Sequence, residues 1–194
     1  MVIIGIDPGT IRMGYAIIKS NLSNKTKVEV LKLGIIDLKN IQEHAEKLKV
    51  IYEEVQDLLE KFSPDSMAIE SPFHGKNVQS MLKLGRSQGI AMAVAYAHNM
   101  TVSEYFPKQI KLSITGNGNA SKEQVLRMLQ QLYDFDYDSK YLDASDALAV
   151  AVCHHFYISN SAIASLSKKK MTKSNNSKKS NWKSFIEKNP HRKI

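Results

Sequence analysis

The chain has 194 residues, of which 43% are apolar and 24% are charged, so it has room for one ordinary domain with a sizeable core. No run of about eighteen uncharged apolar residues occurs and Asp7 interrupts the apolar N-terminus, so we expect no membrane span, no signal peptide and a cytoplasmic location. The single cysteine, Cys153, excludes an internal disulfide and a zinc site built from several cysteines.

The net charge of +8 is concentrated near the C-terminus. Residues 161–194 hold ten Lys and Arg against one acid, Glu187, whereas residues 1–160 hold seventeen against eighteen acids. Because the basic segment lacks the apolar content to fold alone, we predict a folded domain at 1–160 and a disordered tail at 161–194. The tail is either a solubilising appendage or a mobile arm that screens phosphate charge, with Trp182 and Phe185 available for stacking.

The hydrophobic periodicity of the first 160 residues predicts three consecutive strands, followed by helices that alternate with strands. The expected strands are residues 2–7, 14–19, 28–38, 67–70 and 101–106. The expected helices are residues 41–61, residues 77–97, a short helix from Pro107, a helix to Tyr133 that begins with the capping-box residues Ser121 and Gln124, and a last helix from about Asp143. This order describes an α/β fold in which helices cover a mixed sheet.

Four carboxylates fall at the ends of these elements. Asp7 ends the first strand and Glu70 the fourth, while Asp143 and Asp146 are three residues apart and share one face of the last helix. If the first and fourth strands are parallel neighbours, Asp7 and Glu70 emerge side by side at the sheet edge where α/β proteins bind ligands. Four such charges need a cation to stay together, and oxygen ligands suit Mg²⁺ or Mn²⁺.

Each acid also has a purely structural explanation. The helix pair could complement the helix dipole, Asp7 could form an Asx-turn, and Glu70 could cap a strand at the surface. The coincidence of all four at element ends favours a shared site.

Three segments resemble the signature segments of the RuvC family of bacterial Holliday-junction resolvases, in that family's order. They are "IIGIDPGTIRMGYAII" at 3–18, "MAIESPFHGKNVQSMLKLGRSQG" at 67–89 and "DASDALAVAV" at 143–152. The resemblance runs over residues 1–158 and implies a ribonuclease-H-like fold, a five-stranded mixed sheet flanked by helices. It also implies that the catalytic and metal-binding residues are Asp7, Glu70, Asp143 and Asp146.

The activity that the resemblance implies is that of a Mg²⁺-dependent endodeoxyribonuclease in DNA recombination and repair. A homodimer would bind a four-way junction and nick two strands of like polarity, leaving 5′-phosphate and 3′-hydroxyl ends. Two Mg²⁺ ions per site, which Mn²⁺ could replace, would activate the attacking water and stabilise the leaving oxygen. The small residues of "GIAMAVAYA" at 89–97 would be either core or the contact between subunits. The sequence leaves open whether the branch-migration proteins RuvA and RuvB are partners.

Five further residues are DNA-binding candidates through the same resemblance. Phe73 matches an aromatic that stacks on an opened base near the crossover, a contact that contributes about 1–3 kcal/mol. Lys111 and Lys122 match basic residues beside the reacting phosphate, and Lys76 and Arg86 are candidates for contacts with the backbone. Without the resemblance, each lysine is a solvated surface residue and Phe73 is a core or lid side chain.

Three other functions are compatible with parts of the sequence. "GIDPGT" resembles the phosphate-binding opening of sugar kinases and actin-like ATPases, although those proteins need two such domains. A junction-binding module without catalysis is disfavoured because clustered acids repel DNA. A related ribonuclease-H-like nuclease that acts on RNA or RNA–DNA hybrids remains an alternative.

Overall fold

This computed structural model describes residues 1–21, 28–72, 77–133, 135 and 142–174, with side chains as far as Asn160. The chain divides into two units, Met1–Ser159 and Asn160–Ile194. Of the helices in these ranges, none combines the length and the apolar content that crossing a membrane requires.

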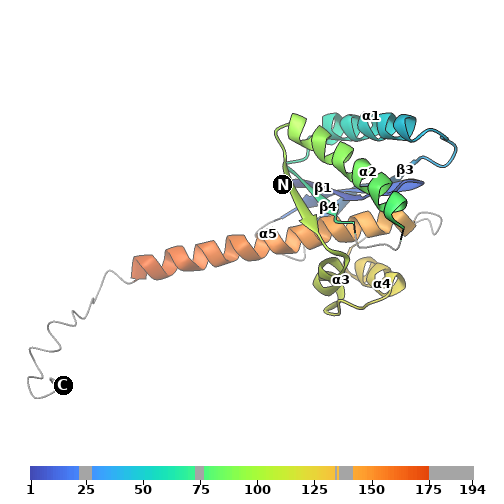
Figure 1. The fold of residues 1–194 in the computed structure, drawn as a ribbon. Helices are drawn as coiled ribbons and strands as arrows, with labels where there is room; N and C mark the ends of the chain where they lie inside the picture. Colours follow the sequence, from blue (N-terminus) through green and yellow to red (C-terminus); the bar gives the residue numbers. More distant parts are fainter. Residues whose placement is uncertain (22–27, 73–76, 134, 136–141, 175–194) are drawn as a thin grey trace, which may run out of the picture. The chain divides into compact units, whose positions relative to one another are not determined.

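A single mixed sheet forms the centre of the first unit (Figure 1). Its strands are β1 (Val2–Asp7), β2 (Arg12–Ser20), β3 (Val28–Asp37), β4 (Ser66–Glu70) and β5 (Thr101–Tyr105), in the order β3-β2-β1-β4-β5. β1 runs antiparallel to β2 and parallel to β4, and β4 runs parallel to β5. The predicted five-stranded mixed sheet is confirmed, and so is the parallel pairing that places the ends of β1 and β4 at one edge.

Helices cover both faces of this sheet (Figure 1). One face carries α1 (His44–Phe62) and α2 (Val78–Ala97), and the other carries α3 (Pro107–Thr115), α4 (Lys122–Leu132) and the start of α5 (Leu142–Ser174). The predicted capping box begins α4, since Ser121 Oγ accepts from the Gln124 amide and Gln124 Oε1 accepts from the Ser121 amide. The α5 helix continues to Ser174, into the segment for which the sequence predicts no element. Disorder of the tail stays a prediction, because residues 175–194 lie outside the described ranges.

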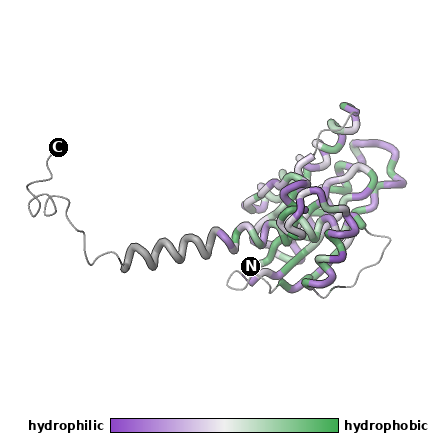
Figure 2. The backbone as a smooth tube through the Cα atoms, turned by 90° about the horizontal axis from the view of Figure 1, so that it is seen from below, coloured by the Kyte–Doolittle hydropathy of each residue, from purple (hydrophilic) through white to green (hydrophobic). Residues whose placement is uncertain are grey.

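The two sheet faces bury separate hydrophobic clusters, because successive side chains of a strand point to opposite sides. In β1, Ile4 and Ile6 pack in the cluster formed with α1 and α2, whereas Ile3 packs in the cluster formed with α5. Figure 2 shows hydrophobic and hydrophilic stretches interspersed along the described part of the chain. Asp7 follows the same alternation as Ile3, so its side chain emerges on the α5 face of the sheet.

Two glycines allow α5 to lie against the backbone of the sheet. A Cβ atom at Gly5 would lie 2.3 Å from the carbonyl oxygen of Ala147, and one at Gly14 would lie 2.0 Å from that of Asp143. Only glycine permits so close an approach of helix and strand. The start of α5, with its two aspartates, is therefore held directly over β1 and β2.

Two buried histidines of α5 attach the helix to the sheet beyond the contacts at Gly5 and Gly14. His154 forms hydrogen bonds through Nε2 with Ser66 Oγ at 3.1 Å and through Nδ1 with Tyr105 Oη at 2.7 Å. His155 forms a hydrogen bond through Nδ1 with Ser20 Oγ at 2.6 Å. These contacts tie α5 to β4, β5 and β2, so its position along the sheet is fixed beyond the glycine contacts as well.

We expect Gly5→Ala to lower the free energy of unfolding by about 2–3 kcal/mol, because the added methyl group collides with α5. The measurement is urea unfolding followed by circular dichroism. The control is Gly85→Ala on the exposed side of α2, where an added Cβ meets nothing within 4 Å and stability should stay equal or rise by up to about 1 kcal/mol. Equal stability of Gly5→Ala and the wild type would contradict the proposed close packing.

Candidate active site

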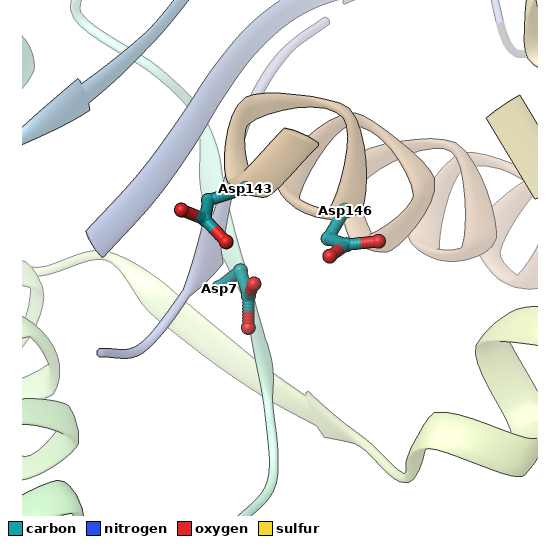
Figure 3. Close-up of side chains that lie close together, drawn as sticks. All are labelled: Asp7, Asp143 and Asp146. Carbon is teal, nitrogen blue, oxygen red and sulfur yellow. The ribbon is translucent and has the colours of Figure 1, made fainter. Parts of the chain in front are cut away.

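The four predicted acids lie at one edge of the sheet. The register of β1 and β4 pairs Ile6 with Ile69, so Asp7 and Glu70 are the next residues on two adjacent parallel strands. Asp143 and Asp146 come from the start of α5 on the same side. Figure 3 shows Asp7, Asp143 and Asp146 directed toward a common space.

Distances group three of the four acids, and shared cavities place the fourth beside two of them. One carboxylate oxygen from each of Asp7, Asp143 and Asp146 lies within 4.8 Å of the others, a grouping that could hold a metal ion. Glu70 lines a cavity of about 170 Å³ together with Asp7 and Asp146, and a second of about 110 Å³ with Asp7. Asp7 and Asp146 thus belong both to the 4.8 Å group with Asp143 and to the larger cavity with Glu70.

Burial and repulsion from neighbouring acids make Asp7, Glu70 and Asp146 hard to ionise. Burial, followed by the charges of Glu70 and Asp146, raises the pKa of Asp7 well above its ordinary value. Burial and the charge of Asp146 raise the pKa of Glu70 to about 7. Burial also raises the pKa of Asp146, although Lys122 opposes that shift. A bound divalent cation would offset this repulsion and favour the ionised form of these acids.

Lys122, at the start of α4, partly neutralises the cluster. Its Nζ donates a hydrogen bond to Asp146 Oδ2 and forms an ion pair with it. Burial is the largest single influence and acts to lower the pKa of Lys122. The hydrogen bond to Asp146 and the negative charges of Asp146, Asp7 and Asp143 together outweigh burial, so the pKa is raised. Lys111 of α3 lines the same cavity as Asp7, Glu70 and Lys122, so both lysines that the sequence predicts beside the reacting group lie at the acid cluster.

Of the remaining three predicted DNA contacts, the structure describes one. Phe73 and Lys76 lie outside the described residues. Arg86 is exposed on α2 and lines neither of the two acid cavities. Sequence reasoning missed Gly5 and Gly14, although a glycine inside a strand is a known sign of close backbone approach.

A family model described as "Crossover junction endodeoxyribonuclease RuvC" matches residues 3–154. The chain belongs to the RuvC family. The RuvC of Christiangramia forsetii is 47% identical over 189 residues, which cover 97% of this chain and 91% of that protein. The RuvC of Bacteroides fragilis is 46% identical over 193 residues, which cover 98% of this chain and 95% of that protein. Both relatives are named crossover junction endodeoxyribonucleases.

Solved structures share the fold of this chain. The RuvC of T. thermophilus, in complex with a Holliday junction substrate, matches with a TM-score of 0.77 and 27% identity over 83% of this chain and 96% of that chain. The yeast mitochondrial Holliday junction resolvase Ydc2 matches with a TM-score of 0.62 and 16% identity over 80% of this chain and 78% of that chain, a likeness of fold alone. The RuvC-type α/β fold that the resemblance implies is confirmed.

We expect the stability of the metal-free protein to fall between pH 5 and pH 8 because of Glu70. Its folded pKa of about 7 lies above the ordinary value of 4.5, so its contribution to stability is present below pH 4.5 and is lost as the pH rises through 7. The loss is at most about 3 kcal/mol. Urea unfolding in a chelator at pH 5 and pH 8 should show that Glu70→Gln is less pH-dependent than the wild type.

The control for this comparison is Glu60→Gln, at an exposed position of α1. This variant should keep the pH dependence of the wild type. Parallel pH profiles for the wild type and Glu70→Gln would contradict the raised pKa.

Proposed function

We propose that this chain is a crossover junction endodeoxyribonuclease, which resolves four-way DNA junctions in recombination and repair by paired symmetric nicks. The observation that carries the proposal is the approach of Asp7, Asp143 and Asp146 to within 4.8 Å, beside Glu70, in a chain of the RuvC family. A surface that only bound DNA would gain nothing from clustered acids, because they repel phosphates. Clustered acids favour DNA binding only if they hold cations, because the cations can then bind a phosphate.

The donor set of the site fits Mg²⁺, with Mn²⁺ as a substitute, because all four side chains offer carboxylate oxygens. We propose that Asp7, Glu70, Asp143 and Asp146 hold two ions per active site. When bound, the ions activate the attacking water and stabilise the leaving 3′ oxygen, which gives 5′-phosphate and 3′-hydroxyl ends. Asp7 and Glu70 line both cavities, so their loss should disturb the whole site.

The basic residues have a complementary role in this proposal. Lys111 and Lys122 line the acid cavity and can donate hydrogen bonds to oxygens of the scissile phosphate. Phe73 is proposed to stack on an opened base, and Lys76 and Arg86 to contact the DNA backbone.

Paired nicks need two active sites, so we propose a homodimer, acting in the cytoplasm. The α2 helix exposes Val78, Leu82 and Tyr96, at 68%, 52% and 56% of their surfaces, and a second copy of the chain would cover such apolar side chains. RuvA and RuvB remain proposed partners on the strength of the family alone.

The central test of the function is cleavage of a synthetic four-way junction. With Mg²⁺ the wild type should nick it at symmetric positions, and it should act far less on linear duplex, flap and RNA–DNA hybrid substrates. Asp7→Asn should lower the cleavage rate by more than roughly 100-fold, because loss of a residue that only supports a metal ligand already costs up to about that much. Junction binding should persist in this variant. Preference for the hybrid would indicate the alternative nuclease, and binding without any cleavage would indicate a binding module.

Deletion of residues 161–194 tests the proposed role of the basic tail. The truncated chain should bind junction DNA more weakly, with the difference greatest at moderate salt, because ten Lys and Arg no longer screen phosphate charge. Metal-dependent turnover of bound junction should be unchanged. Equal affinity with and without the tail across a salt titration would remove this role.

A further inference from the structure

A second group of charged side chains, all of them basic, lies beside the acid cluster on the α1 and α2 face of the sheet. His44 and Lys47 are three residues apart on α1, and Lys83 and Arg86 are three residues apart on α2, so each pair shares one face of its helix. The two helices pack against each other. These four side chains are called the basic cluster below.

Two contacts connect the basic cluster to the acid site. Lys47 Nζ donates a hydrogen bond of 2.9 Å to the carbonyl oxygen of Thr10, in the loop that follows Asp7. Leu84, between the two basic residues of α2, lines the 110 Å³ cavity with Asp7 and Glu70. The cavity thus extends from the acids toward the helix that carries Lys83 and Arg86.

No ion pair within the described part of the chain offsets the charge of the basic cluster. Among the residues with described side chains, neither Lys83 nor Arg86 forms an ion pair, and both are exposed. Burial, and then the positive charges of Arg86, Lys83 and Lys47, lower the pKa of His44. The Nε2 atom of His44 is buried without a hydrogen-bond partner. Like charges held together in this way are unfavourable unless an anion binds among them.

We propose that His44, Lys47, Lys83 and Arg86 bind a phosphate of the DNA strand that is cut, at a position near the scissile phosphate. The inference rests on the proposed function and adds a second contact point for the same substrate. Acids and bound cations would hold the scissile phosphate, and the basic cluster would hold another phosphate of the same strand. Two such points fix the direction and register of a strand, which one point cannot do.

The first test compares two double variants that remove the same net charge. Binding of a labelled four-way junction is measured by fluorescence anisotropy without divalent metal, across a range of KCl concentrations. Lys83→Gln/Arg86→Gln should weaken binding about tenfold at moderate salt and reduce the slope of log affinity against log salt by about one to two.

The matched control is Lys49→Gln/Lys61→Gln, two α1 lysines outside the cluster, of which Lys49 is paired with Glu53. This control should keep the slope and affinity of the wild type. If both double variants lost the same affinity for the junction, the loss would be explained by net charge alone, and the proposed phosphate site would be wrong.

The second test locates the phosphate. Single phosphates within a few nucleotides of the mapped cut are replaced by neutral methylphosphonate. At one position, the replacement should weaken DNA binding by the wild type about as much as Lys83→Gln/Arg86→Gln does. The same replacement should weaken binding by the double variant little further, because the phosphate and the basic side chains would act through one contact. Independent, additive losses at every position would overturn the proposal.

The nuclease function and the phosphate-binding role of the basic cluster can be disproved separately. A wild type that cleaves junctions, with a double variant that binds like the wild type, would overturn the basic cluster and leave the proposed nuclease function intact. A wild type that neither binds nor cleaves junctions would overturn both.

Discussion

Electrostatic repulsion among partly buried carboxylates is the constraint on which the active site depends. The fold forces these charges together, since parallel β1 and β4 end at the same edge and α5 is seated over β1 and β2 through Gly5 and Gly14. Hydrogen bonds from His154 and His155 to three strands keep the helix in register. The hydrophobic clusters on both sides of the sheet stabilise a structure that the acids alone would oppose.

The same electrostatics explain why basic groups surround the acids. Lys122 is paired with Asp146, and Lys111 lies at the same cavity. On α1 and α2, Lys47, Lys83 and Arg86 lie close enough to His44 to lower its pKa. DNA is a regular line of negative charges, so a surface that carries both cation-holding acids and basic groups is more complementary to it when metal is bound. Metal binding and substrate binding should therefore favour each other at this site.

More of the chemistry of the site than of the packing of the helices can be predicted from the sequence. Alternating apolar residues identify the strands, and the i, i+3 spacing places Asp143 and Asp146 on one helix face. Asp7 and Glu70 are recognisable because each ends a buried strand. The closeness of α5 to β2 depends on backbone contact at Gly14, and the basic cluster depends on how α1 packs against α2. Such contacts join residues far apart in the chain and leave no periodic pattern.

Anomalous diffraction from crystals grown with Mn²⁺ is the most direct test of the central claim. The account predicts manganese peaks coordinated by oxygens of Asp7 together with Glu70, Asp143 or Asp146, and loss of at least one peak in Asp7→Asn crystals. Absence of manganese from this cluster at millimolar Mn²⁺, or manganese bound only elsewhere on the chain, would contradict it.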